Sequence, residues 1–85
     1  PEFLHAFTNL VDTLVPGLEV VAPLHDLDKS EVIRAAASTG IDWTRTWSCL
    51  LDHPRHCGRC PQCEARRTAF AAAGIADPTD YLHAP

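Results

Sequence analysis

All four cysteines of the sequence lie in one short segment, and they are its strongest chemical feature. The first is followed, after seven residues, by three more that are separated from one another by two residues each. Zn²⁺ prefers thiolate donors, and a Cys-x2-Cys turn brings two of them to one side of the backbone. Gly58 suits such a turn, and a helix that begins at Pro61 directs free N–H groups at the sulfurs. The spacing therefore favours one zinc ion per chain, held by Cys49, Cys57, Cys60 and Cys63.

Two other uses of the four cysteines stay open. An even number of cysteines permits two disulfides in any of three pairings, and an iron–sulfur cluster is also held by four thiolates. The sequence contains no secretory signal, so we expect a reducing, cytoplasmic compartment, which disfavours disulfides. Four sulfurs fill a tetrahedral site, so we expect a structural rather than a catalytic zinc. His53 and His56 flank the cluster, but the cysteines suffice as ligands.

The remaining residues exclude several kinds of site. No serine has a nearby His-Asp arrangement, and neighbouring glycines are at least sixteen residues apart, so no glycine-rich phosphate loop is present. Seven Lys+Arg against eleven Asp+Glu give a net charge of −4, so we expect no direct nucleic-acid binding. No apolar run approaches the ~20 residues that span a bilayer, so we expect no membrane segment.

The elements around the cysteines are predicted from local signals. An apolar stripe from Phe3 to Leu14 predicts a helix that ends near Val15, because Pro16-Gly17 stops it. Asp28 and Glu31 have the spacing of a capping box, which predicts a helix that Gly40 closes. The sequence predicts a third, alanine-rich helix that begins at Pro61, runs through Ala73 and is ended by Gly74, and a terminal helical turn after Asp77-Pro78.

One strand is predicted, over Leu18–Leu24, from its valines and the turn residues on either side. The chain offers this strand no partner, so we expect it to extend a sheet supplied by a missing part of a larger protein or by another chain. Self-association, or a homodimer, follows as an expectation.

Four further side chains are interpreted from their surroundings in the sequence. Trp43 and Trp47 are interpreted as core residues beneath the cysteine loop. Arg66 and Arg67 are interpreted as a solvated helix face, with guidance of an anion as the alternative.

The sequence resembles the C-terminal end of the 7-cyano-7-deazaguanine synthase family. The most specific matches are the motifs Thr46-Trp47-Ser48-Cys49, His56-Cys57-Gly58-Arg59-Cys60-Pro61-Gln62-Cys63 and Asp77-Pro78-Thr79-Asp80-Tyr81. Weaker matches at Pro1-Glu2-Phe3, at Pro23-Leu24 and from Leu27 to Ile33 extend the likeness over essentially the whole chain.

The resemblance implies a fold and an activity. It implies an α/β fold: a mostly helical C-terminal fragment of a doubly wound adenine-nucleotide-hydrolase-like (ATP-pyrophosphatase) domain with a four-cysteine zinc site. Residues 1–48 would complete the α/β domain, and residues 49–85 would form the zinc-binding segment and terminal helices. Family members are ATP-dependent ligases that convert 7-carboxy-7-deazaguanine and ammonia to 7-cyano-7-deazaguanine, a precursor of queuosine.

The likeness also implies what this chain lacks. The family's Ser-Gly-Gly-x-Asp-Ser phosphate loop is absent from these residues, so we expect ATP and Mg²⁺ to bind only to the intact enzyme and the chain alone to be inactive. Its partners would be the missing ATP-binding half and a deazapurine substrate. Two other interpretations stay open: the equivalent part of a tRNA-modifying or sulfur-transfer ATP-pyrophosphatase, and a free-standing zinc interaction module.

Overall fold

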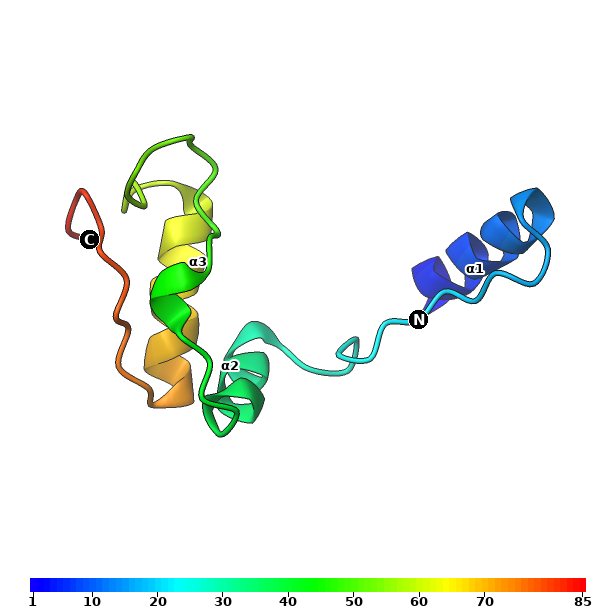
Figure 1. Cartoon of the computed structure of the whole chain (residues 1–85), viewed down its shortest axis with the longest axis horizontal. Helices are drawn as coiled ribbons and strands as arrows, with labels where there is room; N and C mark the ends of the chain where they lie inside the picture. Colours follow the sequence, from blue (N-terminus) through cyan, green and yellow to red (C-terminus); the bar gives the residue numbers. More distant parts are fainter.

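The chain folds into helices joined by long irregular segments. The computed structural model describes residues 1–85 and contains α1 (Glu2–Leu14), α2 (Lys29–Ala37), the 3-10 helix η1 (Trp43–Arg45) and α3 (Pro61–Ala73). Its radius of gyration is 16.3 Å and its extents are 47 × 29 × 21 Å, whereas a compact domain of this length has a radius of about 12 Å. The shape is elongated because α1 stands apart from the rest (Figure 1). None of these helices has the length and apolar character needed to cross a membrane.

Helix α1 confirms the helix predicted from the N-terminal apolar stripe. It begins directly after Pro1 and ends at Leu14. None of its residues is buried, and the apolar stripe that predicts it, including Phe3 and Leu10, faces solvent. The helix therefore presents an apolar face that nothing else in the chain covers.

The strand predicted over Leu18–Leu24 is wrong for this structure. Residues 18–22 have no regular secondary structure, and the chain turns over residues 23–26. The turn is closed by hydrogen bonds from His25 N to the Ala22 carbonyl and from Leu27 N to the Leu24 carbonyl. A strand exists only through hydrogen bonds to a neighbour, and these 85 residues supply none.

Helix α2 begins with the predicted capping box. The Asp28 carboxylate accepts the Glu31 N–H at 2.9 Å, and Glu31 accepts the Asp28 N–H at 3.3 Å. Hydrogen bonds from Ser30 and from the Glu31 N–H hold the pKa of Asp28 below its usual value. The helix ends at Ala37, and Gly40 makes the following turn with a φ of 75°.

Helices α2 and α3 pack together around a small apolar core. Ile33, Ala69 and Phe70 are buried there, and the Trp43 ring meets Phe70 edge-on with a centroid distance of 5.4 Å. Arg34 adds a hydrogen bond to the Ala72 carbonyl. The two helices lie on either side of residue 48, and the division of the chain there stays a prediction.

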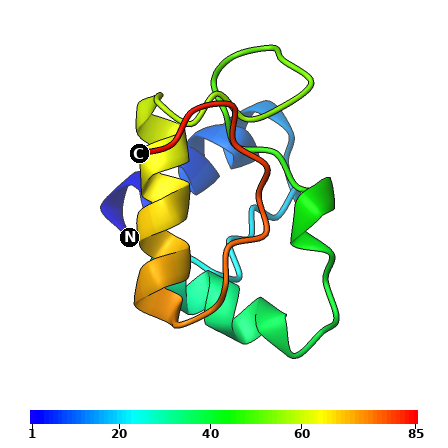
Figure 2. The same ribbon diagram turned by 90° about the vertical axis from the view of Figure 1, so that its left-hand side faces the viewer.

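Helix α3 agrees with its sequence signals, whereas the C-terminal segment does not. Gly74 ends α3 in a left-handed conformation, but no helical turn follows Asp77-Pro78. Asp77 instead accepts the Thr79 N–H and the Tyr81 hydroxyl, which holds the segment extended beside α3 (Figure 2). Tyr81 forms an isolated parallel bridge with His56, and this bridge ties the C-terminus to the cysteine segment.

Candidate metal centre

The fold brings the four cysteine sulfurs together at the start of α3. The four Sγ atoms all lie within 4.8 Å of one another. Cys60 is the N-cap of α3, and Cys63 lies in its first turn. Cys49 and Cys57 come from the loop before the helix, and these two and Cys63 are buried. The residues singled out by spacing in the sequence therefore form one cluster in space.

The distances between the sulfurs suit a tetrahedral thiolate site. Cys57 Sγ and Cys63 Sγ are 3.9 Å apart, and so are Cys60 Sγ and Cys49 Sγ. Metal–sulfur bonds of about 2.3 Å in a tetrahedron place the sulfurs about 3.8 Å apart. All four cysteines are free thiols, and these separations are far longer than a disulfide bond. The structure thus holds a metal-binding cluster rather than the two disulfides.

Backbone N–H groups surround the sulfurs. Cys49 Sγ accepts hydrogen bonds from the N–H groups of Leu51 and Cys57 at 3.4 and 3.3 Å. The remaining three sulfurs also accept backbone hydrogen bonds, from Arg59, Cys60, Cys63 and Gly58. Such donors stabilise negative charge on sulfur. The loops are therefore shaped for thiolates rather than for neutral thiols.

The pKa values of the cysteines show why the cluster needs a cation. Hydrogen bonds, chiefly from the Leu50 N–H, lower the pKa of Cys60 to about 6. Burial has the opposite effect on its neighbour and raises the pKa of Cys63 to about 12. Without a positive ion the four sulfurs cannot all be ionised at neutral pH. A divalent metal removes this conflict, because it compensates the buried charge directly.

The two histidines beside the cluster lie outside the group of metal-binding side chains. His56 is buried, and its Nε2 accepts the Ser48 N–H at 3.4 Å. Burial, followed by the nearby charge of Arg66, lowers the pKa of His56, so the ring is neutral at pH 7. His53 is exposed.

Arg66 is buried, which corrects its interpretation as a solvated residue. Only 6% of it is exposed, and its guanidinium forms hydrogen bonds with four groups that come from three segments of the chain. The acceptors are the Trp43 carbonyl and the hydroxyls of Thr46, Ser48 and Thr79. Arg66 therefore fastens η1, the start of the cysteine loop and the C-terminal segment to α3.

The Arg67 side chain also contacts other parts of the protein and does not form a solvated helix face. Its guanidinium lies over the Tyr81 ring at 4.0 Å from the centroid, and it donates hydrogen bonds to the carbonyls of Gly58 and His83. The Tyr81 hydroxyl is in turn held by Asp77, and burial raises the pKa of Tyr81 to about 12. Arg67 and Tyr81 together hold the C-terminus against the cysteine turn.

Comparison with known proteins shows the family to which this chain belongs. Residues 1–74 match the family described as queuosine biosynthesis protein QueC. The chain belongs to the QueC family. No solved structure matches it.

The QueC assignment agrees with curated relatives that are named 7-cyano-7-deazaguanine synthase. The protein of Methanothrix thermoacetophila is 41% identical over 87 residues, which cover 98% of this chain and 39% of that protein. The protein of Azoarcus sp. is 44% identical over 89 residues, covering 95% of this chain and 39% of that protein. The protein of Thermosynechococcus vestitus is 45% identical over 69 residues, covering 80% of this chain and 30% of that protein. The chain thus spans about two fifths of the length of these relatives or less.

Two features of the site in this QueC chain were not predicted from the sequence: the burial of Arg66 and the exposure of Trp47. Arg66 lies three residues after Cys63 and three before Ala69, a spacing that places all three on one face of α3. Since cysteine and alanine there are buried, this spacing was a usable signal for a buried arginine. Trp47 is half exposed, with 50% of its surface accessible, so its interpretation as a core residue is wrong.

The turn at Gly58 gives a direct test of how the C-terminus supports the QueC cluster. Gly58 has a φ of 85°, and a Cβ there would overlap the His83 carbonyl. We expect Gly58→Ala to lower the free energy of unfolding of the metal-loaded chain by about 3 kcal/mol, since backbone strain and a displaced C-terminus add together.

Gly40→Ala is the matched control for Gly58→Ala. Gly40 has a similar φ of 75° but nothing within 4 Å of the added Cβ, so we expect a loss of only about 1 kcal/mol from strain. Urea unfolding measures both values. Equal losses would show that the contact between the glycine turn and His83 does not matter.

Proposed function

We propose that this chain is the zinc-binding portion of a 7-cyano-7-deazaguanine synthase. The observation that carries the proposal is a four-cysteine cluster of tetrahedral dimensions in a chain of the QueC family. In this proposal the chain completes, at its C-terminal end, the doubly wound α/β fold of the ATP-pyrophosphatases. The apolar face of α1 and the exposed side chains of Leu18, Val21 and Leu24 would then pack against the rest of that fold or against a second copy.

The proposed reaction is the ATP-dependent formation of a nitrile. ATP activates the carboxylate of 7-carboxy-7-deazaguanine, ammonia displaces the activated oxygen to give an amide, and a second ATP drives loss of water from the amide. This makes the enzyme a C–N ligase of the cytoplasm. The names of the relatives and of the family support the product of this reaction, 7-cyano-7-deazaguanine, and its link to queuosine.

Zinc would be held by Cys49, Cys57, Cys60 and Cys63 and would have a structural role. When bound, the ion supplies a cross-link between the cysteine loop and the first turn of α3, and the four thiolates fill its tetrahedron. The N–H groups around the sulfurs lower the cost of gathering negative charge. Arg67 holds the C-terminal segment against the turn at Gly58 through hydrogen bonds to the carbonyls of Gly58 and His83.

Nitrile formation by a chimeric enzyme tests this function. The chain replaces the matching segment of the Azoarcus sp. relative, to which it is 44% identical, and the purified chimera receives 7-carboxy-7-deazaguanine, ammonia and Mg-ATP. We expect the nitrile to form, and Cys63→Ala in the same chimera to abolish it. A folded, zinc-loaded chimera that turns over a different ATP-pyrophosphatase substrate but forms no nitrile would contradict the proposal.

The isolated chain is expected not to bind ATP. Its glycines are isolated and no cluster of donors could hold a triphosphate, so the proposed ATP site lies outside these residues. Calorimetric titration of the zinc-loaded chain with Mg-ATP should give no heat of binding, whereas the chimera should bind. Micromolar affinity of the isolated chain would reveal a nucleotide site within residues 1–85.

A further inference from the structure

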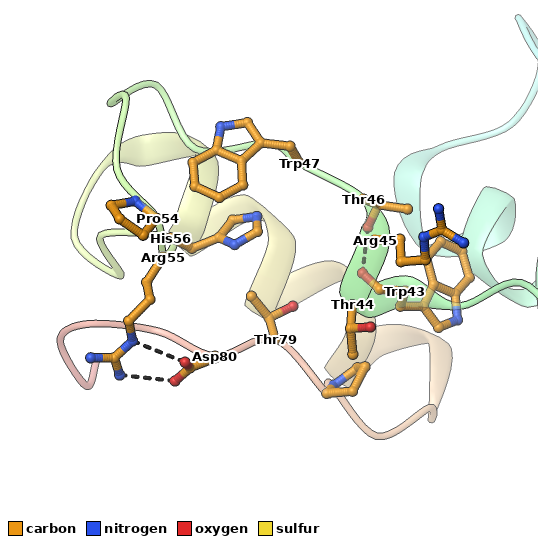
Figure 3. A pocket seen from close by; sticks show the side chains of 11 residues that line it. Trp43, Thr44, Arg45, Thr46, Trp47, Pro54, Arg55, His56, Thr79 and Asp80 are labelled. Atoms are coloured by element: carbon orange, nitrogen blue, oxygen red, sulfur yellow. Dashed lines mark hydrogen bonds and ion pairs between the residues drawn. The ribbon is translucent and has the colours of Figure 1, made fainter.

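One hollow in the surface opens onto the cysteine cluster. It has a volume of about 470 Å³, and Cys57 and Cys60 form part of its wall. The groove drawn in Figure 3, between residues 43–47 on one side and residues 54–56 and 78–80 on the other, contains no cysteine. A small molecule from solvent therefore reaches the sulfurs through the first hollow, which is called the cysteine hollow below.

Cys60 is the sulfur that the cysteine hollow leaves accessible. Cys49, Cys57 and Cys63 are buried, with 7%, 5% and 0% of each residue exposed, whereas Cys60 is partly exposed. Oxidation of a thiolate follows its exposure. Hydrogen peroxide is little larger than water, so it needs only the exposed part of one sulfur. An oxidant of this size meets Cys60 first.

A second sulfur lies within reach of Cys60. Cys49 Sγ is 3.9 Å from Cys60 Sγ, so a sulfenic acid formed on Cys60 has a thiol partner beside it. Cys49 belongs to an irregular segment rather than to a helix. The two residues after it, Leu50 and Leu51, line the hollow and are exposed. Little packing therefore opposes the movement that would join the two sulfurs.

The wall of the cysteine hollow favours the reduction of a peroxide. Its polar side chains, apart from the cysteines, are those of Arg59, His53 and His83, and it contains no carboxylate. Arg59 forms no ion pair within the chain. A guanidinium in the wall stabilises the negative charge that develops on the leaving oxygen as an O–O bond breaks.

We propose that Cys60 is a modification site for hydrogen peroxide, at which oxidation releases the metal and unfolds α3. The Cys60 thiolate attacks one peroxide oxygen, the O–O bond breaks and hydroxide leaves, which gives a sulfenic acid. The Cys49 thiolate then attacks the Cys60 sulfur and displaces a second hydroxide, which gives a disulfide. Two thiolates lose two electrons in total, and one peroxide is reduced to two hydroxides.

The disulfide takes two of the four donors from the cluster. Metal binding and folding are coupled in so small a unit, so the metal and the first turn of α3, which Cys60 caps, are lost together. The inference rests on the structural zinc of the proposed function but not on its substrate.

Release of zinc under excess hydrogen peroxide, followed with a chromogenic chelator, tests the site in the zinc-loaded chain. We expect one equivalent to be released while the helical signal in far-UV circular dichroism falls at the same rate. A thiol reductant with added zinc should restore both. Dimedone added with the peroxide should label Cys60 before the other cysteines, as fragment-ion mass spectrometry of the tryptic peptides shows.

Cys60→His keeps four metal donors but removes the oxidisable sulfur. We expect zinc to be retained and its release by peroxide to slow by about tenfold or more, because the remaining sulfurs are buried. Gln62→Ala, at an exposed residue between two cysteines, should release zinc at the unmodified rate. Zinc content before peroxide is added verifies that each variant is loaded.

A variant that fills the hollow tests access without changing a metal ligand. Leu82 lines the cysteine hollow and is 45% exposed, so Leu82→Trp should slow zinc release several-fold. Leu14→Trp, at an exposed leucine of α1, should not change the rate. First labelling at Cys57 or Cys63, or unchanged release from both loaded Cys60→His and Leu82→Trp, overturns the inference.

The chimera distinguishes a failure of this inference from a failure of the proposed function. If the chimera forms nitrile and keeps its zinc in peroxide, the function stands and the inference is wrong. If the chimera forms no nitrile but loses its zinc through oxidation of Cys60, the inference is supported and the proposed function falls.

Discussion

Replacement of Cys60 by serine is expected to unfold the chain from Trp47 to Gly74. The side chain of Cys60 is both a member of the metal cluster and the cap of α3, and metal binding and folding are coupled in so small a unit. The apolar core of Ile33, Ala69 and Phe70 is too small to hold α2 and α3 together without the metal centre. Far-UV circular dichroism should show most of the helical signal lost, because α1 alone has only 13 residues and is marginal in water.

Gln62→Ala is the control for Cys60→Ser. Gln62 lies between two of the cysteines and is exposed, so its replacement should leave both the helical signal and the zinc content unchanged. Removing zinc with a chelator should reproduce the effect of Cys60→Ser, and returning zinc should reverse it. A native-like spectrum in the metal-free chain would contradict the coupling of metal and fold.

Arg66→Met is expected to lower the free energy of unfolding by about 3 kcal/mol. The substitution keeps much of the buried volume, but it leaves hydroxyl and carbonyl acceptors such as Thr79 and the Trp43 carbonyl without their donor. Hydrogen bonds from a charged donor contribute about 1.5–3 kcal/mol each in folded proteins, and an unpaired buried polar group adds a penalty. Urea unfolding of the zinc-loaded chain measures the loss.

Two further variants separate the charge of Arg66 from its geometry. Arg66→Lys keeps the charge but cannot reach acceptors on several sides at once, so we expect a loss nearly as large as that of Arg66→Met. Arg59→Met, at an exposed arginine, should change the stability by less than about 0.5 kcal/mol. If all three variants behave alike, Arg66 does not fasten the segments around α3.

The helices could be predicted because their signals are local. The Asp28 capping box and the left-handed Gly74 act within one turn of backbone, so the residues that decide the structure are adjacent in the sequence. The prediction of a strand over Leu18–Leu24 failed because the signal is not local. A strand depends on hydrogen bonds to a partner strand, and these residues do not include one. The helical turn predicted after Asp77 failed because the same sequence signal fits two structures. An aspartate before proline can cap a helix, but here the Asp77 carboxylate forms a turn with Thr79 and binds the Tyr81 hydroxyl.

The candidate site also has one part that could be predicted from the sequence and one part that could not. The cysteine cluster was predictable because its ligands fall within fifteen residues and Cys-x2-Cys spacing has one dominant chemical use. The packing of His56 between Trp47 and Tyr81 could not be predicted, because these residues come from separate segments that the Arg66 hydrogen bonds and the His56–Tyr81 bridge hold together. The burial of Arg66 itself depends on acceptors that come from both sides of α3 in the sequence.

Elemental analysis of the chain purified without chelators tests the central claim most directly. We predict one zinc ion per chain, with all four cysteines protected from thiol reagents until the metal is removed. Less than about half an equivalent of zinc, with disulfides or iron in its place, would contradict the assignment of Cys49, Cys57, Cys60 and Cys63 as a structural zinc site.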